Sequence, residues 1–414
     1  MLKSCLWLLC LCLWLSETIA ELQTDYSGGL KEADEDETLR FIALRLAVNC
    51  TDRETKFAKM QHSSYWTLMN YVPANHGLIR CSTSVTYTTH GDYRYLSNVA
   101  PLVKRWRAPI SLALYAPGTD FKATVHSIMW LRQCAPEREL IKRWVSFHIY
   151  FHVEHMPDKV YAQKSLGSMK VKCTRAAPFH NVPQSALYRS QRELDYPINV
   201  GRNIAKQASL THYILASDIE LYPTPGLVDG FLKMLTANMH LVNTKERIVY
   251  PLNIFEVHAN ATIPSTKMEL RRQLATGEAI PFHIHVCPQC NKAQNLPIWI
   301  NQTDNAKSIN VFSVSKRLNL WDPIYIGTIH DPEYDERLSW EGMSDKMVHS
   351  YALCLMDYSF LTLDNAFLVH KPGIKMGHTD PARLSLAAKI HKKIRNRFLV
   401  EYLQKYGYQE GCTL

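Results

Sequence analysis

Two acidic residues, one position apart, follow an apolar run in the middle of the chain. Residues 213–216 read Tyr-Ile-Leu-Ala and lead directly to Asp218 and Glu220. In open α/β sheets, ligands bind beyond the carboxyl ends of the strands, and side chains two positions apart can face the same side. Converging carboxylates suit a hard divalent cation, Mn2+ or Mg2+, and the oxygens of a diphosphate. The pair therefore indicates a metal-dependent nucleotide-sugar site. The alternative is a pair of acids that cap the next helix or face water.

A second group of potential ligands lies at residues 283–290. His283, His285 and Cys287 alternate so that a strand would place them on one face, and Cys290 follows three positions later. Two histidines and two cysteines at such spacing can hold zinc. An oxidising compartment instead favours disulfides, local or to other partners. We expect a disulfide here and keep a secreted zinc-binding protein as a rival hypothesis.

The elements that would position these side chains alternate between strand and helix. β-Branched and aromatic runs predict strands, and apolar residues at helical spacing predict helices. The predicted strands cover residues 84–90, 109–117, 145–153 and 212–223, and the predicted helices cover residues 95–106, 197–209 and 226–239. A strand, helix, strand order predicts a parallel sheet.

The N-terminus reads as a targeting segment followed by a linker. Residues 1–20 carry Lys3, an apolar stretch and a small-residue end at Ala20, typical of a secretory signal. The apolar stretch is shorter than the roughly 20 residues of a spanning helix, which favours a cleaved signal peptide over a type II signal anchor. We expect an acidic, flexible stem at residues 21–45, an N-terminal elaboration at 46–80 and the main domain at 81–414.

Sequons and cysteines agree with a secretory compartment. Asn49, Asn260 and Asn301 each begin an Asn-x-Thr sequon that would accept an N-glycan if exposed. Of the 11 cysteines, three lie in residues 1–20, and the remaining eight can pair in an oxidising lumen. The sequence does not choose among the pairings.

Composition excludes several classes of protein. With 46% hydrophobic and 21% charged residues, the chain is neither disordered, collagen-like nor a coiled coil. After residue 20 no apolar run reaches 18 residues, which excludes a polytopic membrane protein. The net charge of +9 is dispersed, which argues against nucleic-acid binding and favours anionic partners. The basic run at residues 389–397 reads as the solvated face of a terminal helix.

Several stretches between residues 80 and 410 resemble, in order, the LARGE-type glycosyltransferases, glycosyltransferase family 49. They are residues 101–117, 196–207, 217–227, 286–290, 321–327, 332–337 and 365–375. The resemblance implies an α/β fold of the GT-A class, a Rossmann-like mixed sheet flanked by helices, in residues 81–414. It also implies that a UDP-sugar binds with a divalent metal bridging its diphosphate.

The resemblance also assigns roles to residues. Asp218 and Glu220 match the family's Asp-x-Asp motif, with Glu in the second place, and His370 matches a third metal ligand. The residues implied to bind the nucleotide-sugar are Thr88, His90, Asn199, Arg202, Asn203, Lys371, Gly373 and Lys375. Arg202 would bind phosphate or the carboxylate of a uronic acid, or pair with Asp218 structurally. Asp335 is the first choice for the catalytic base, followed by Glu336 and then by Glu341 and Asp345, in a segment that departs from the family at residues 338–342.

The function that this resemblance implies is metal-dependent, inverting transfer of a sugar to a glycan on a glycoprotein. The expected donor is UDP-glucuronic acid, the cofactor Mn2+ or Mg2+, and the acceptor an O-mannosyl or related glycan in the Golgi lumen. Such an enzyme could form an oligomer with itself or with other glycosyltransferases. The rival is a catalytically inactive protein of the same fold that binds glycans or a partner in the secretory pathway; Glu220 and the altered segment motivate it.

Overall fold

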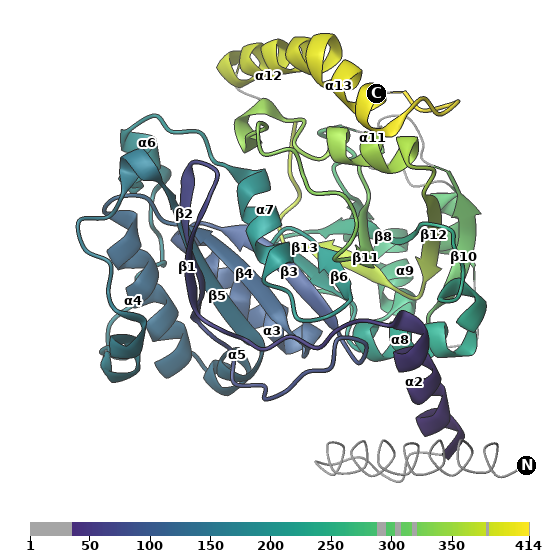
Figure 1. Ribbon diagram of the computed structural model, residues 1–414, viewed down its shortest axis with the longest axis horizontal. Helices are drawn as coiled ribbons and strands as arrows, with labels where there is room; N and C mark the ends of the chain where they lie inside the picture. Colours follow the sequence, from purple (N-terminus) through teal and green to yellow (C-terminus); the bar gives the residue numbers. More distant parts are fainter. Residues whose placement is uncertain (1–34, 288–294, 303–307, 317–320, 378–380, 414) are drawn as a thin grey trace, which may run out of the picture.

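The computed structural model describes residues 35–287, 295–302, 308–316, 321–377 and 381–413, and a large mixed sheet runs through them (Figure 1). Its described strands lie in the order β1-β2-β5-β4-β3-β6-β11-β8-β12-β10, with β13 pairing β7 and β8, and β9 pairing β8. Their bounds are β1 (Ala58–His62), β2 (Tyr65–Val72), β3 (Val85–Gly91), β4 (Ile110–Tyr115), β5 (Val145–His152), β6 (Tyr213–Ala216), β7 (Leu221–Pro223), β8 (Ile248–Val257), β9 (Ala279–Pro281), β10 (Asn310–Ser315), β11 (Ile324–Thr328), β12 (Ser359–Asp364) and β13 (Phe367–His370).

The strands β5, β4, β3 and β6 form a parallel block at the centre of the sheet. Ile110 of β4 pairs with Tyr87 of β3 and with Val145 of β5, and Val85 of β3 pairs with Tyr213 of β6. This block confirms the predicted parallel sheet and the Rossmann-like α/β fold of the GT-A class. The carboxyl ends of β3 and β6 lie at one edge, so the residues that follow them are brought together.

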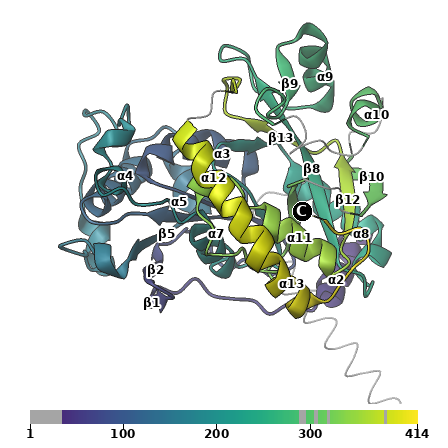
Figure 2. The same cartoon turned by 90° about the horizontal axis from the view of Figure 1, so that it is seen from above.

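Helices cover both faces of this block (Figures 1 and 2). On β4, Leu112 and Leu114 belong to the large hydrophobic core, whereas Ala113 and Tyr115 pack with α7, as expected from the alternation of a strand. The described helices are α2 (Glu35–Val48), α3 (Val99–Trp106), α4 (Asp120–Gln133), α5 (Arg138–Trp144), α6 (Tyr188–Gln191), α7 (Ile198–Gln207), α8 (Leu227–Ala237), α9 (Lys267–Thr276), α10 (Leu296–Asn301), α11 (Met347–Leu355), α12 (Pro381–Lys393) and α13 (Leu399–Tyr406). The predicted helices correspond to α3, α7 and α8.

The second half of the sheet brings a late strand beside the acidic pair. β7 begins directly after Glu220 and pairs antiparallel with β13, and Leu221 lies opposite His370. β13 also pairs in parallel with β8, so His370 stands at the end of a buried strand. A histidine far along the sequence therefore becomes a neighbour of Glu220.

The N-terminal part is more ordered than an acidic stem. Helix α2 covers residues 35–48, within and beyond the segment expected to be flexible, and its Leu44 is buried in the main core. Acidic residues at a helix N-terminus are favourable for its dipole, which explains why an acidic stretch can be helical. The hairpin β1–β2 then adds two antiparallel strands beside β5.

Disulfides join segments that are distant in the sequence. The described pairs are Cys50–Cys81, Cys134–Cys173 and Cys354–Cys412. Cys287 is also disulfide-bonded, which leaves no thiolate there for zinc and argues against the zinc-binding hypothesis; Cys290 lies outside the described residues. Asn49, Asn260 and Asn301 are exposed, as glycan acceptors must be.

The expected signal segment, residues 1–20, lies outside the described part of the chain. Within the described part, no helix is both long and apolar enough to cross a membrane.

Candidate functional site

A tight turn carries Asp218 and Glu220 from β6 into β7. The Ser217 N–H donates to Thr88 O (3.0 Å), and the Leu221 N–H donates to Asp218 O (3.0 Å). The buried Tyr87 hydroxyl lies 2.9 Å from Asp218 O and 2.7 Å from Leu221 O. These bonds fix the backbone of the turn from which both carboxylates project.

The Asp218 carboxylate points toward three basic groups. Its Oδ1 lies 3.1 Å from Arg202 Nη2 and 3.5 Å from His90 Nε2, and its Oδ2 lies 3.5 Å from Lys346 Nζ. Burial alone would raise the pKa of Asp218, but Lys346, His90 and Arg202 outweigh it and hold the pKa well below the usual range. Asp218 is therefore ionised at physiological pH.

Glu220 faces His370. Glu220 Oε2 lies 3.8 Å from His370 Nε2, and the Lys371 N–H donates to Glu220 O at 2.7 Å. His370 Nδ1 lies 2.8 Å from Lys371 O, which can only accept, so Nδ1 carries a proton, and Nε2 is the ring nitrogen that faces Glu220. That Nε2 is buried and has no hydrogen-bond partner. Burial raises the pKa of Glu220, but the opposing effects of His370, Lys375 and Lys371 are larger together, so the pKa lies below its usual value. Glu220 is therefore ionised as well.

This donor set fits a divalent cation in its chemistry. Carboxylate oxygens and a neutral imidazole nitrogen are ligands for Mn2+ and Mg2+, and an orphaned buried Nε2 opposite a carboxylate is what a metal would satisfy. Among the described residues, however, no three His, Cys, Asp or Glu side chains stand close enough together to hold a metal as they are. Asp218 is instead drawn toward Arg202 and Lys346.

A polar stripe on α7 holds the loop of residues 331–346. The Asn199 amide donates to Asp335 O and Asp345 O (2.8 and 2.9 Å), and the Asn203 amide donates to Tyr334 O (2.9 Å). Lys206, one turn further, contacts Asp331 O. Asn199 and Asn203, which the resemblance implies to bind the nucleotide-sugar, thus have their amides engaged with this loop.

Arg202 lies in the same stripe and is almost completely buried. Besides Asp218, its Nη1 bonds Asn199 Oδ1 (2.8 Å) and Asp345 Oδ2 (2.5 Å), and its guanidinium stacks over Tyr334 at 5.2 Å. All these partners belong to the protein, so the structural interpretation of Arg202 describes its contacts better than a direct bond to a ligand.

The four acids considered as catalytic base lie in different surroundings. Asp335 forms a two-point ion pair with Arg337 (2.6 and 2.8 Å). Glu336 bonds His62 and Asn203. Glu341 contacts Arg189 and the Tyr196 N–H, and burial raises its pKa. Asp345 alone among the four shares a partner, Arg202, with Asp218.

Unsatisfied polar groups line the end of β3. The side-chain oxygens of Thr88 and Ser217 are buried without a hydrogen-bond partner. His90 contacts the Tyr196 hydroxyl through Nδ1 (2.9 Å) and faces Asp218 through Nε2. Thr88 and His90 therefore lie beside the acidic turn, with Thr88 Oγ1 free to bond a ligand.

Two loops close the other side of the site. Gly373 has φ of 129°, a conformation that favours glycine, and its N–H donates to Val257 O (2.9 Å). The buried Glu256 faces the N–H groups of both His283 and Lys375 at 3.4 Å and so ties the loops together. Lys375, Lys346 and His370 all act on the pKa of His283, which burial lowers to about 3, so His283 lies in the same charged neighbourhood.

Lys346, His283 and Glu256 were not identified from the sequence as donor-site residues. His283 was noticed only for its spacing to Cys287, and nothing in the sequence places Lys346 opposite Asp218.

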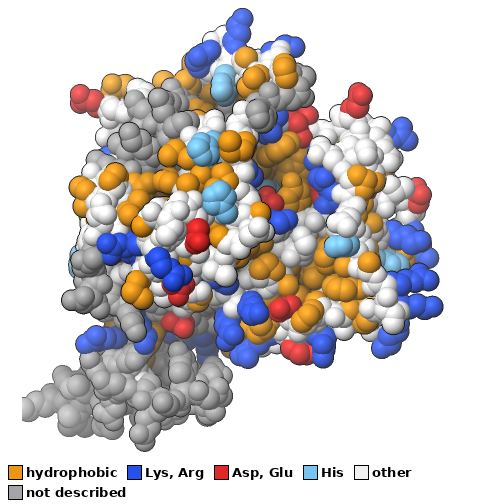
Figure 3. Space-filling view, turned by 180° about the vertical axis from the view of Figure 1, so that it is seen from behind, with side chains coloured by type: hydrophobic (Ala, Val, Ile, Leu, Met, Phe, Trp, Pro, Cys, Tyr) orange, Lys and Arg blue, Asp and Glu red, His pale blue; other side chains and the backbone are white. Residues whose placement is uncertain are grey.

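On the face opposite to that of Figure 1, the surface is hollowed below its uppermost part, and basic and acidic side chains are interspersed around the hollow (Figure 3).

Comparisons with known proteins identify the family of this chain. Residues 84–407 match the family model described as "Glycosyl-transferase for dystroglycan". Beta-1,4-glucuronyltransferase 1 of Danio rerio is 29% identical over 298 residues, which cover 70% of this chain and 67% of the relative. Xylosyl- and glucuronyltransferase LARGE1 of Homo sapiens is 25% identical over 358 residues, 86% of this chain but 39% of the relative. A solved structure of S. aureus TarS aligns over 75% of this chain and 40% of its own, with 10% identity and a TM-score of 0.30.

Proposed function

Since this chain belongs to glycosyltransferase family 49 and is therefore a glycosyltransferase, we propose that it transfers glucuronic acid from UDP-glucuronic acid to a glycan on a glycoprotein, with inversion and with the help of a divalent metal. Relatives named glucuronyltransferases support the donor. The observation that carries the proposal is that Glu220, two residues after Asp218, faces the buried His370 Nε2, which has no hydrogen-bond partner.

The metal site would use Asp218, Glu220 and His370, with Mn2+ or Mg2+ as the ion. When bound, the ion would stabilise the negative charge that develops on the departing diphosphate. Occupation of the site requires Asp218 to exchange its contact with Lys346 for the ion. Lys346 Nζ, with its side chain 22% exposed, would then be free to bind the donor.

Three lysines lie around this site. Lys346, Lys371 and Lys375 act on the pKa of Asp218 or Glu220, and Lys371 and Lys375 are exposed. Ammonium groups can bond a diphosphate or the carboxylate of a uronic acid. These lysines are therefore compatible with UDP-glucuronic acid as the donor.

For the base we favour Asp345 over Asp335. The acceptor hydroxyl must lose its proton as its oxygen attacks C1 of the sugar, while UDP leaves from the opposite face of the sugar. Asp345 shares Arg202 with Asp218, which places its carboxylate next to the acidic turn. The carboxylate of Asp335 pairs with Arg337, whose other ion pair among the described residues is to Glu401.

We place the reaction in the secretory pathway, in the Golgi lumen. Disulfides and three exposed sequon asparagines are consistent with an oxidising, glycosylating compartment. The acceptor would be a glycoprotein glycan of the O-mannosyl or related type, and assembly with itself or another glycosyltransferase remains part of the proposal.

UDP release by the purified full chain from a panel of UDP-sugars tests the proposal. We expect Mn2+-dependent release selective for UDP-glucuronic acid, lost with a chelator and in Asp218→Asn, and unchanged in Asp158→Asn, which alters an exposed aspartate. Calorimetric binding of UDP is measured in parallel. Binding without turnover on any acceptor would favour the inactive rival, and no binding would refute the site.

A further inference from the structure

A second hollow lies at the end of the sheet opposite to Asp218. It has a volume of about 580 Å³ and lies where β3 and β4 begin, whereas Asp218 lies beyond their carboxyl ends. Its walls come from the loop of residues 76–84, the end of α3, the end of α5 and the start of α8. A volume of this size is typical of a small-ligand site.

The charge of this groove is strongly one-sided. Lys104, Arg105 and Arg107 line it, against a single carboxylate, Asp229. Lys104 and Arg107 are exposed, and within the described residues neither forms an ion pair. Arg105 donates to Pro223 O and Pro264 O, acceptors that carry no full charge and leave its positive charge in the wall.

The start of α8 adds backbone donors, and Asp229 is the acidic residue in its first turn. Its N-cap is Gly226, so no side chain caps the first turn, and Gly226 and Val228 line the groove. The positive end of the helix dipole and its free N–H groups attract an anion. Ser84, at the opposite wall, is 9% exposed, and its side chain forms no hydrogen bond among the described residues. Its hydroxyl can therefore donate to an anion in the groove.

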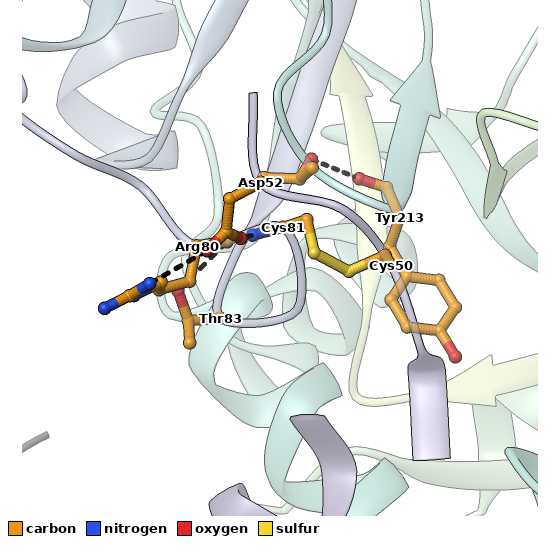
Figure 4. The surroundings of a disulfide bond; sticks show 7 residues. Cys50, Asp52, Arg80, Cys81, Thr83 and Tyr213 are labelled. Carbon is orange, nitrogen blue, oxygen red and sulfur yellow. Dashed lines mark hydrogen bonds and ion pairs between the residues drawn. A yellow bond between two sulfur atoms is a disulfide. The ribbon is translucent and has the colours of Figure 1, made fainter. Parts of the chain in front are cut away.

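The wall that carries Ser84 is rigid. Cys81 is bonded to Cys50, and Asp52 accepts from the Cys81 N–H (2.7 Å) and from Arg80 Nη1 (3.0 Å), as Figure 4 shows. Thr83 donates to Arg80 O (3.1 Å) in the same turn. The groove is therefore formed before a ligand arrives, which lowers the entropic cost of binding.

We propose that this groove binds an acidic oligosaccharide, a part of the acceptor glycan remote from the sugar being extended. Its carboxylates would lie between Lys104, Arg107 and the start of α8. The half-buried Trp144 supplies a ring against which a sugar can pack. A concave groove with an aromatic wall suits a chain of sugar rings better than the flat surface of a membrane. The choice of a glycan rests on the proposed acceptor class, whereas the existence of the site does not depend on turnover.

Calorimetry on the full chain tests this with a hyaluronan hexasaccharide, which alternates glucuronic acid and N-acetylglucosamine, and with the neutral chitin hexasaccharide as the matched ligand. We expect binding of the acidic ligand only, weakened about tenfold or more in Lys104→Glu/Arg107→Glu. Lys389→Glu/Lys392→Glu makes the same charge change on exposed α12 and should bind as the parent does. Ser84→Ala, which changes no charge, should weaken binding by a few fold.

Asp218→Asn separates this inference from the proposed function, because it should lose UDP release and keep hexasaccharide binding. Equal affinity for both hexasaccharides, or equal loss in the α12 variant, would overturn the proposal. So would tighter, groove-dependent binding to vesicles that contain phosphatidylserine, which would assign the groove to a membrane surface. Thermal unfolding of each variant shows whether the fold is retained.

Discussion

The guanidinium of Arg202 joins Asp218 to Asp345, with Nη2 3.1 Å from Asp218 Oδ1 and Nη1 2.5 Å from Asp345 Oδ2. Asp218 follows β6, Asp345 precedes α11, and Arg202 lies on α7. One buried cation therefore sets the distance between the acidic turn and the loop that carries the favoured base. Its planar fork can bond both carboxylates at once, which a lysine cannot do.

Arg202→Lys should therefore lose activity even though the charge is kept. We expect kcat to fall by about 100-fold or more, because a single ammonium cannot hold both acids in place. Arg202→Ala should in addition lower the stability by about 2 kcal/mol, since it leaves the carboxylate of Asp345 and the partly exposed carboxylate of Asp218 without their partner. Initial rates and urea unfolding measure the two effects. Arg53→Lys, at an exposed position, is the control, and full activity of Arg202→Lys would refute the bridging role.

Asp345→Asn should abolish transfer while UDP still binds. The amide keeps the shape and a bond to Arg202 but cannot accept the proton, so we expect kcat to fall about 100-fold to 10,000-fold. Asp335→Asn and Glu336→Gln should lose much less, because these acids pair with Arg337 and His62 and not with Arg202, the partner of Asp218. Rates of transfer and UDP affinity are compared in all three. The opposite order, with Asp335→Asn inactive and Asp345→Asn active, would restore Asp335 as the base.

Lys346→Met should raise KM for the donor more than it lowers kcat. Removing the ammonium takes away a cation for the diphosphate, and we expect KM for the donor to rise about tenfold. Because Lys346 lowers the pKa of Asp218, the acidic limb of the rate profile should also move to higher pH. Lys389→Met, which removes an exposed lysine on α12, should change neither quantity. An unchanged KM would exclude Lys346 from the donor site.

The sequence predicts the parts of the site that local pattern controls. Apolar periodicity identifies β3, β4, β6 and α7, and the acidic pair after β6 stands where α/β sheets bind ligands. Contacts between segments that are distant in the sequence leave no such local pattern. Lys346 reaches Asp218 only because α7 holds the loop of residues 331–346, and His283 is turned toward the site by a positive φ of 57° that the sequence does not encode.

In the N-terminal region, the sequence pattern does not reveal the elements that the structure contains. β1 is an edge strand whose residues are exposed or half-buried and mostly polar, so no alternation marks it. Acidic residues at the start of α2 suggest a linker by composition, although they also suit a helix N-terminus. Tertiary packing of Leu44 decides between the two.

The hairpin β1–β2 contacts the loop of residues 331–346 through His62, whose Nε2 lies 2.6 Å from Glu336 Oε1. The bond to Glu336 raises the pKa of His62 above its usual 6.5, against a smaller opposing effect of burial. A group whose pKa is higher in the folded protein stabilises it fully below the unfolded pKa, and this contribution is lost as pH rises through the folded pKa. The pair should therefore contribute about 1 kcal/mol at pH 6 and little at pH 9.

Urea unfolding of the parent and of His62→Gln at these two pH values measures this contribution. Glutamine can still donate to Glu336 but does not titrate, so we expect the two proteins to differ in stability at pH 6 and to converge at pH 9. His240→Gln, which changes an exposed histidine, should follow the parent at both values. A constant difference between the parent and His62→Gln across this range would mean that the contact is a neutral hydrogen bond, and that the hairpin holds the loop of residues 331–346 equally at both pH values.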